Sequence, residues 1–308
     1  MSVGAPDPAD VPTAPPRTDN PRLGIALMIL TSMIFACQDG MSRYLGSHYS
    51  VVTVVMIRYW FFALFVLTLA SAQKGGIRRV ARTDRLAMQI TRGILLAAEI
   101  CVTVLSFVVL GLIGTHAIFS AYPLLVAALA GPVLGERVGW RRRLAIGVGL
   151  LGVLVILRPG FTVFSPLALV PLAGAFMFAF YALLTRLVGR TDTAETSLFY
   201  TGIAGAVAIT LVGPFFWTPI HGAFDWFWML TLCAFGVGGH FTMIKAYEVA
   251  EAGTIQPFAY FQLVWVTIMA LVLFGERPDR FTILGAALIL AAGVYTLIRQ
   301  ARLSRTRS

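Results

Sequence analysis

The chain has 308 residues, of which 58% are hydrophobic and 12% are charged, and its net charge is +10 at pH 7. Soluble domains usually contain about 25% charged residues, so this chain has too few charges to cover a surface exposed to water. The composition therefore excludes an ordinary soluble enzyme or binding domain and predicts an all-α integral membrane protein.

The two ends of the chain differ in composition from the rest. Residues 1–22 are rich in proline, contain several aspartates and lack the apolar stretch of a signal peptide. We expect them to form a disordered cytoplasmic tail, because they cannot bury a core. Residues 299–308 form a basic tail, which we expect to rest on anionic lipid at the cytoplasmic face.

Between these tails lie apolar blocks of roughly twenty residues, the length that crosses a hydrocarbon core at about 1.5 Å per residue. The boundary within LGLIG, at Gly111–Gly114, carries no charge and is the weakest of the divisions between them. We predict ten transmembrane helices, at 24–45, 50–72, 86–110, 112–134, 142–158, 165–187, 195–216, 226–248, 253–274 and 281–298.

The basic residues are distributed unevenly between the connections. Most of the 24 Lys and Arg residues lie in the tails or in every second connection, on the side of the N-terminus. This asymmetry follows the positive-inside rule. It predicts a bacterial-type inner-membrane protein with both termini in the cytoplasm, and it makes nucleic acid an unsuitable partner despite the positive charge. The expected partners are the lipid bilayer and a small-molecule substrate, and the sequence leaves monomer and homodimer open.

An internal repeat is the most informative feature of the sequence. GTHAIFSAYPLLVAALAGPVLGER at 114–137 resembles GTIQPFAYFQLVWVTIMALVLFGER at 253–277, and FACQDGMSR at 35–43 resembles FAFYALLTR at 178–186. The offset of about 140 residues predicts two units of five helices, 23–160 and 161–298. Because five is odd, the second unit enters the membrane from the opposite side, as in the inverted repeats of secondary transporters.

Two five-helix units, each with a Gly-Thr…Gly-Glu-Arg helix followed by a glycine-containing helix, resemble the EamA domains of the drug/metabolite transporter superfamily. This resemblance covers nearly the whole chain between the tails. It implies a ten-helix bundle with a central cavity lined by the third, fourth, eighth and ninth helices. It also implies that the first, second, sixth and seventh helices act as moving gates, and that the substrate is a small metabolite, often amino-acid-like.

Ionisable side chains are costly at membrane depth, so each is a functional hypothesis. Gln38 and Asp39 lie within the first predicted helix and Arg58 within the second. We expect Asp39 and Arg58 to approach each other, directly or through water. They form either a structural ion pair or an outer gate that contacts substrate.

Glu99 and His240 occupy nearly equivalent levels in the two repeats, close to the middle of the membrane. A carboxylate and an imidazole in a cavity of low dielectric are well suited to exchange a proton near neutral pH. They are a candidate pair for proton coupling or substrate binding. The alternative gives each a separate structural partner.

Three charged residues lie near the cytoplasmic ends of the third and eighth helices. Arg92 either extends its charge to the membrane interface or receives an anionic substrate group. Lys245 and Glu248 have the spacing of an ordinary i,i+3 pair on one helix face.

The fourth and ninth helices carry further candidates for the cavity wall. Pro123 and Pro257 are expected to kink these helices. Gln262 is the strongest of the candidates, because an amide in lipid needs partners. The polar and aromatic candidates are His116, Ser120, Tyr122, Gln256, Tyr260, Gln262 and Trp265.

Together these observations predict a secondary active transporter of a small polar, zwitterionic metabolite. Proton coupling is a further prediction, and export is slightly favoured over uptake by the family resemblance. The alternative is a membrane enzyme acting on a lipid, but the sequence lacks the paired catalytic motifs that such an enzyme needs. No cofactor or metal is expected, because Cys37, Cys101 and Cys233 have no ligand spacing.

Overall fold

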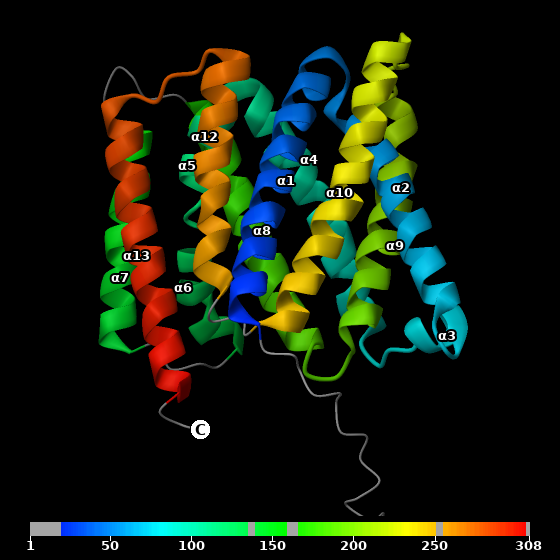
Figure 1. The fold of residues 1–308 in the computed structure, drawn as a ribbon, viewed down its shortest axis with the longest axis horizontal. Helices are drawn as coiled ribbons and strands as arrows, with labels where there is room; N and C mark the ends of the chain where they lie inside the picture. The colour runs from blue at the N-terminus through cyan, green and yellow to red at the C-terminus, as the bar shows by residue number, and fades with distance from the viewer. Residues whose placement is uncertain (1–19, 135–138, 159–165, 251–254, 306–308) are drawn as a thin grey trace, which may run out of the picture.

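The computed structural model describes residues 20–134, 139–158, 166–250 and 255–305, and over these ranges it contains helices and no strand. Figure 1 shows the helices standing side by side in one bundle. Their bounds are α1 Pro21–His48, α2 Val51–Ala72, α3 Gly76–Val80, α4 Leu86–Leu110, α5 Leu112–Phe119, α6 Tyr122–Leu134, α7 Trp140–Leu157, α8 Leu169–Val188, α9 Ala194–Val212, α10 Ala223–Val249, α12 Phe261–Phe274 and α13 Arg280–Arg305, with short 3-10 turns η2 Pro166–Ala168, η3 Gly213–Phe216 and η4 Gln256–Tyr260.

Each apolar block of the sequence is helical over its described residues. Among the described residues, 6 helices are long and apolar enough to cross a membrane. Three shorter apolar helices lie at 143–157, 258–274 and 280–296. The chain is therefore a multi-pass membrane protein.

The fourth and ninth blocks are interrupted close to their prolines, which confirms that part of the prediction. The fourth begins after Gly111, whose φ of 86° ends α4, and breaks again between α5 and α6, just before Pro123. The ninth begins as the 3-10 turn η4, which contains Pro257, and continues as α12. Proline lacks the N–H that a continuous helix needs, so both helices are divided where the chain passes a proline.

Hydrogen bonds between helix ends show which ends of two helix pairs lie together. The Asn20 N–H donates to the Val249 carbonyl at 2.8 Å, so α1 begins where α10 ends. At the opposite end of the bundle, Thr53 Oγ1 donates to the Phe216 carbonyl at 3.1 Å, so α2 begins where the α9–η3 segment ends. Helix α1 begins and helix α13 ends at the same end of the bundle, which we call the terminal end (Figure 1).

The contacts between helices follow a twofold pattern. We call α1–α7 the first segment and α8–α13 the second. Helix α1 of the first segment packs against α10 of the second, and α8 of the second packs against α4 of the first. Likewise α2 packs on α9, and α7 packs on α13. Helices α1 and α8 run in opposite directions, because α1 leads away from the terminal end and α8 leads towards it (Figure 1).

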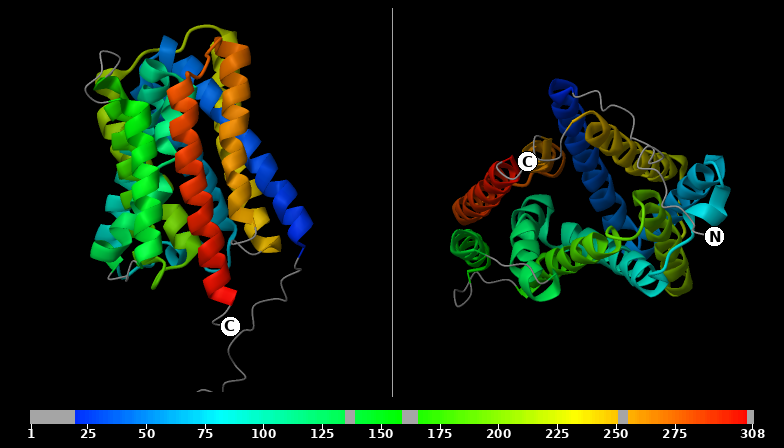
Figure 2. Two further views of the ribbon diagram at one scale, coloured as in Figure 1. Left: turned by 90° about the vertical axis from the view of Figure 1, so that its left-hand side faces the viewer. Right: turned by 90° about the horizontal axis from the view of Figure 1, so that it is seen from below.

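Glycines bring α7 and α13 into backbone contact at one edge of the bundle. A Cβ at Gly152 would lie 2.7 Å from the Gly285 carbonyl oxygen, and a Cβ at Gly285 would lie 2.5 Å from the Gly152 carbonyl oxygen. The right view of Figure 2 shows this helix pair at the edge of the molecule. The pair therefore depends on glycine at both positions, since any side chain there would push the helices apart.

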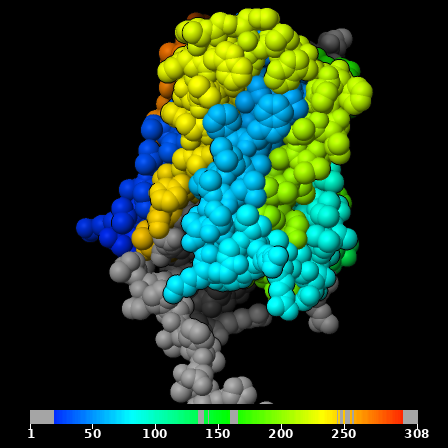
Figure 3. Space-filling model, turned by 90° about the vertical axis from the view of Figure 1, so that its right-hand side faces the viewer, coloured from blue at the N-terminus to red at the C-terminus, as the bar shows by residue number. Residues whose placement is uncertain are grey.

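The outward surface of the bundle is apolar. Leu64 on α2, Leu211 on α9 and Val272 on α12 are 60%, 71% and 74% exposed. Figure 3 shows the face on which α2, α9 and α10 lie side by side. Large exposed aliphatic side chains on every side are the surface that a lipid environment requires.

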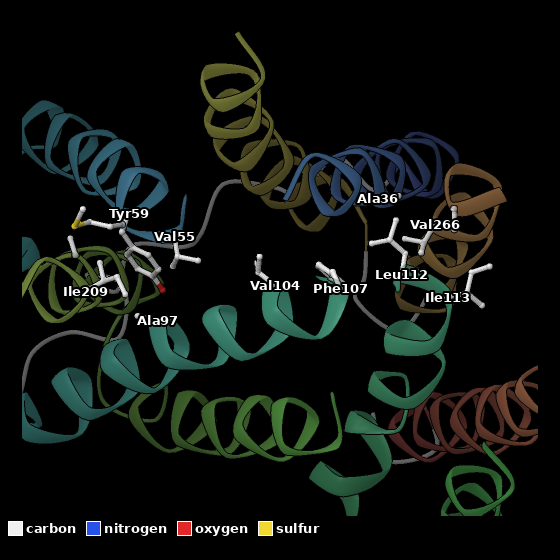
Figure 4. Packing of buried hydrophobic residues seen from close by; sticks show 13 residues of the cluster. Ala36, Val55, Tyr59, Ala97, Val104, Phe107, Leu112, Ile113, Ile209 and Val266 are labelled. Atoms are coloured by element: carbon white, nitrogen blue, oxygen red, sulfur yellow. The ribbon is translucent and has the colours of Figure 1, made fainter. Parts of the chain in front are cut away.

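A buried apolar cluster connects the helices at the centre. In Figure 4, Tyr59, Ala97 and Ile209 lie on one side, where α2, α4 and α9 meet, and the residues of α1, α5 and α12 lie on the other. Val104 and Phe107 of α4 lie between the two groups (Figure 4). Helix α4 therefore spans the middle of the bundle, and the polar residues described next surround it.

Candidate functional site

Asp39 on α1 is the centre of a polar group inside the bundle. Gln262 on α12 donates a hydrogen bond from Nε2 to Asp39 Oδ2 at 2.9 Å. His116 on α5 brings Nε2 within 3.1 Å of the same oxygen, and its ring stacks on Phe107 at 5.3 Å between centroids. The carboxylate thus joins α1 to two interrupted helices, one from each half of the chain.

Arg58 on α2 has few partners for a charged group inside a membrane protein. Its Nη1 donates to Ser42 Oγ at 3.2 Å, and no ion pair joins it to Asp39 among the described residues. The direct form of the predicted Asp39–Arg58 pair is therefore wrong, because Asp39 is turned towards α5 and α12. The two charges still interact electrostatically over a longer distance.

Glu99 on α4 is 3% exposed and accepts one hydrogen bond, from Thr103 Oγ1 at 2.6 Å to Oε1. The charges of Arg58 and Asp39 both act on this carboxylate. No described cation pairs with Glu99 directly. A buried carboxylate and a partly buried guanidinium, each without a described counter-ion in contact, therefore lie within electrostatic range of each other.

His240 on α10 lies among aromatic rings. Its ring stacks on Phe62 with 5.7 Å between centroids, and it meets Phe35 edge to face with 5.4 Å between centroids. Gly239 provides the space for this contact, because a Cβ there would lie 2.5 Å from a ring carbon of Phe35. Among the described residues, no hydrogen bond or ion pair joins His240 to Glu99, although the Arg58 charge acts on both.

Arg92 on α4 lies in a different place from this group. It is 1% exposed, donates to Gln89 Oε1 at 2.9 Å and Thr185 Oγ1 at 3.1 Å, and also donates to the Ser197 carbonyl. Its guanidinium also lies over the Tyr181 ring at 5.4 Å. The expectation that Arg92 extends to the membrane interface is wrong, because these partners on α8 and α9 hold it inside.

The surroundings of Arg92 form a polar network that sequence reasoning missed. Gln89, which is fully buried, donates from Nε2 to Asp192 Oδ2 at 2.7 Å, and Thr83 donates to the same oxygen. Partial burial acts to raise the pKa of Asp192. Hydrogen bonds from Thr83, Gln89 and Thr191 outweigh it and hold the pKa below its usual value. The network ties α4 to the turn between α8 and α9 at the terminal end.

Replacing Arg92 by methionine is expected to destabilise the protein by about 3 kcal/mol, because buried acceptors on Gln89 and Ser197 would lose their donor. Thermal unfolding of the purified protein in detergent measures the change. Arg190→Met, at an exposed arginine in the turn after α8, is the control and should leave the unfolding temperature nearly unchanged. An Arg92→Met protein as stable as the control would contradict this role.

Four other candidates lie around the bundle rather than in one place. Gln38 faces α10, where a Cβ at Gly236 would lie 3.2 Å from Gln38 Oε1. The ring of Tyr122 meets the ring of Phe178 on α8 edge to face, with 4.8 Å between centroids. Trp265 packs on the central apolar cluster, while the Tyr260 hydroxyl points towards α13, where a Cβ at Gly293 would lie 2.4 Å from it.

The remaining candidates contribute less. The Ser120 hydroxyl donates to the His116 carbonyl at 2.6 Å within its own turn. Lys245 is exposed, with its ammonium 5.7 Å from the Phe241 ring centroid. The side chains of Glu248 and Gln256 lie outside the described part of the structure, so the Lys245–Glu248 pair stays a prediction.

Glu276, in the second Gly-Glu-Arg sequence, has a structural partner that the repeat alone did not reveal. Its Oε1 and Oε2 accept hydrogen bonds from the backbone N–H groups of Leu112 at 3.1 Å and Ile113 at 3.0 Å, at the start of α5. It also forms an ion pair with Arg43 of α1. A Cβ at Gly111 would lie 2.6 Å from Glu276 Oε1, so glycine is required there. We call this group the Glu276 clamp.

The fold and the polar centre define a multi-pass helical membrane protein whose bundle encloses buried charges. The sequence pattern of the EamA-like transporter family matches residues 22–158 and 166–298. The chain therefore belongs to the EamA-like transporter family, and it is a transporter rather than an enzyme.

Similar proteins share most of the chain's length. An S-adenosylmethionine uptake transporter of Rickettsia prowazekii (strain Madrid E) is 26% identical over 275 residues, 89% of this chain and 92% of that protein. A riboflavin transporter of Vibrio cholerae is 25% identical over 297 residues, 93% of this chain and 96% of that protein. A solved crystal structure that is 16% identical superimposes with a TM-score of 0.60, over 89% of this chain and 96% of that one, which shows the fold alone.

Proposed function

We propose that this protein is a proton-coupled secondary transporter of a small zwitterionic, amino-acid-like metabolite. The observation that carries the proposal is the pair of unmatched charges, Arg58 and Glu99. Each makes one hydrogen bond to a hydroxyl, and neither has a described counter-ion in contact. Buried ions are normally paired, because desolvation costs several kcal/mol for each ion.

A zwitterion supplies both missing partners. Its carboxylate would pair with the guanidinium of Arg58, whose planar fork suits two parallel hydrogen bonds. Its ammonium would pair with the carboxylate of Glu99. A neutral solute would leave both charges unmatched, so the proposed site discriminates by charge pattern rather than by size.

Alternating access is the proposed mechanism. Two five-helix segments of opposite direction can rock about a central site to give two states, one open to each side. The antiparallel course of α1 and α8 and the twofold contact pattern support an inverted repeat. By the family resemblance, α4, α5–α6, α10 and η4–α12 would form the wall of the central cavity, and α1, α2, α8 and α9 would act as gates.

The named relatives suggest where a search for the substrate should begin. S-adenosylmethionine, named for the Rickettsia protein, carries an amino-acid group with both charges, which fits Arg58 and Glu99. Riboflavin, named for the Vibrio protein, has no ammonium group. We therefore propose an amino-acid-bearing solute before a flavin.

The proposal includes the membrane and the orientation. A bacterial inner membrane with both termini in the cytoplasm agrees with the positive-inside pattern of the sequence, and the named relatives are bacterial. Export remains the prediction from family resemblance, although the Rickettsia relative is named an uptake transporter. Vesicles of both orientations would measure the direction of flux.

Reconstitution in liposomes tests the function. Vesicles loaded with unlabelled methionine, S-adenosylmethionine or riboflavin are diluted into trace label, and exchange is followed with and without a pH gradient. We expect exchange of an amino-acid-bearing solute and its accumulation when the gradient is imposed. Exchange of riboflavin alone, or exchange that a pH gradient never drives uphill, would contradict the proposal.

A further inference from the structure

We propose that His116 and Asp39 form the proton-binding pair of the transport cycle, and that Gln262 connects this pair to the second half of the chain. The inference rests on the proposed function and names the residues that perform its coupling step. It replaces Glu99 and His240 as the coupling pair, because those two side chains make no direct contact in the described structure.

The imidazole of His116 and the carboxylate of Asp39 lie at ion-pair distance inside the bundle. His116 Nε2 lies 3.1 Å from Asp39 Oδ2, and the two side chains are only 12% and 13% exposed. Imidazole is the side chain whose charge ordinarily changes between pH 5 and 8. A proton taken up on Nε2 creates a close ion pair with the carboxylate, and its release leaves Asp39 as an anion that keeps its bond from Gln262.

The chain offers few alternatives to His116. It contains 4 histidines. His48, the last residue of α1, and His221, in the connection before α10, are exposed at the end of the bundle opposite the terminal end. His240 is enclosed by Phe35 and Phe62, with no described carboxylate in contact. Among the described residues, His116 alone combines membrane depth with a carboxylate at ion-pair distance.

The charges near the pair come from α2, from α4 and from the Glu276 clamp, in which Glu276 and Arg43 lie at the start of the helix that carries His116. Arg58 on α2 acts on Asp39 with an attractive interaction, and Glu99 on α4 acts on it with a repulsive one. Helix α12 contributes the neutral Gln262. Helices α7, α8 and α13, which also pack against α5, carry no charged residue in their apolar stretches. Asp39 is thus the charged group in direct contact with the imidazole.

The pair also lies where the two halves meet. Asp39 and His116 belong to the first matched segment and Gln262 to the second. Protonation of His116 neutralises the Asp39 charge in its vicinity and weakens the acceptor that holds Gln262. Proton release strengthens it. Binding and release of one proton would therefore change the contact between α1 and α12, which is the contact that a rocking motion must alter.

The test separates movement of substrate from movement of protons. His116→Gln removes the titrating group and keeps a polar side chain of similar size. In liposomes, we expect this variant to keep at least half of the wild-type exchange rate, in which substrate crosses in both directions without net proton flux. Accumulation driven by a pH gradient should fall by at least tenfold. His221→Gln is the matched control and should keep both activities, whereas His240→Gln tests the competing assignment of the coupling residue.

Three outcomes would overturn the inference. His116→Gln could accumulate substrate as the wild type does. It could lose exchange as well, which would indicate a role in moving substrate rather than protons. His240→Gln could show the coupling defect instead. Wild-type protein that performs no exchange at all would contradict the proposed function itself, so the two failures are distinct.

Asp39→Asn gives a second, independent readout. The purified protein in weakly buffered detergent solution should change its number of bound protons when substrate binds. We expect this change to disappear in both Asp39→Asn and His116→Gln, while substrate binding is retained. An unchanged proton signal in either variant, with substrate still bound, would overturn the pairing.

Discussion

Replacing Arg58 by methionine is expected to reduce exchange of a zwitterionic substrate by about 100-fold, which corresponds to about 2.7 kcal/mol of lost interaction. The same change should leave thermal stability nearly unaltered. The guanidinium gives up one hydrogen bond, to Ser42, and its removal also relieves the cost of keeping a cation away from water. Exchange in liposomes and unfolding in detergent measure the two effects.

Arg92→Met provides the matched comparison. Both arginines lie on helices within the bundle, but Arg92 donates hydrogen bonds to three residues and lies over a tyrosine ring. We therefore expect Arg92→Met to lower stability clearly, whereas Arg58→Met lowers transport. A buried charge that several protein groups hold is structural, and one with few protein partners is available to a ligand.

Arg58→Lys refines this prediction. Lysine keeps the positive charge but cannot form two parallel hydrogen bonds to a carboxylate, so exchange should fall to an intermediate level. If Arg58→Met exchanges substrate at the wild-type rate, Arg58 does not bind substrate. If it is as unstable as Arg92→Met, the residue is structural after all.

The helices could be predicted from the sequence because helix formation in a membrane is decided locally. Each apolar block must satisfy its own backbone hydrogen bonds, since the lipid offers none. Block 86–110 accordingly coincides with α4, and the divisions at Gly111 and before Pro123 follow from backbone properties of those residues. Long-range information was not needed for any of these features.

The partners of the polar residues could not be predicted in the same way. Gln262 was expected to need a partner, but its bond to Asp39 joins residues 223 positions apart. The repeat compares equivalent positions in the two halves and does not state which residues meet at the interface. For that reason the repeat predicted that Glu99 and His240 lie at the same depth in the membrane. The contact that forms is instead between Asp39 and His116.

Arg92 shows a further limit of sequence reasoning. Its position near a helix end suggested a side chain that reaches the membrane interface. The outcome depends on Gln89 and Ser197, two uncharged residues that attract little notice in a sequence. A buried arginine requires several acceptors in the right directions, and only the packing of α4 against α8 and α9 provides them.

Glu276→Ala is expected to destabilise the protein by about 3–5 kcal/mol, because it removes one member of a largely buried ion pair. Two backbone N–H groups at the start of α5 would also lose their acceptor, and an anionic side chain is favourable at that position of a helix. Glu195→Ala is the control. Glu195 and Arg79 form an exposed pair at 3.9 Å, and such pairs contribute about 0–1 kcal/mol.

The Glu276 clamp should also influence which end of the transporter is open. Arg43 lies on α1, while Glu276 follows α12 and holds the start of α5, so the clamp joins a proposed gate helix to the proposed cavity wall. Opening at this end, opposite the termini, requires the Arg43–Glu276 pair to separate. Glu276→Gln removes the charge attraction and keeps the side-chain size, so it should favour that opening.

Thiol labelling can measure this shift. Cys37 lies on α1, on the membrane side of Arg43, and is half-buried. In a protein with Cys101 and Cys233 replaced by serine, Glu276→Gln should speed labelling of Cys37 several-fold when an impermeant maleimide is added opposite the termini. Arg43→Met should do the same, and the double variant should add little, because both changes break one contact. Additive effects would show that Arg43 and Glu276 act independently and that their pairing does not hold this end closed.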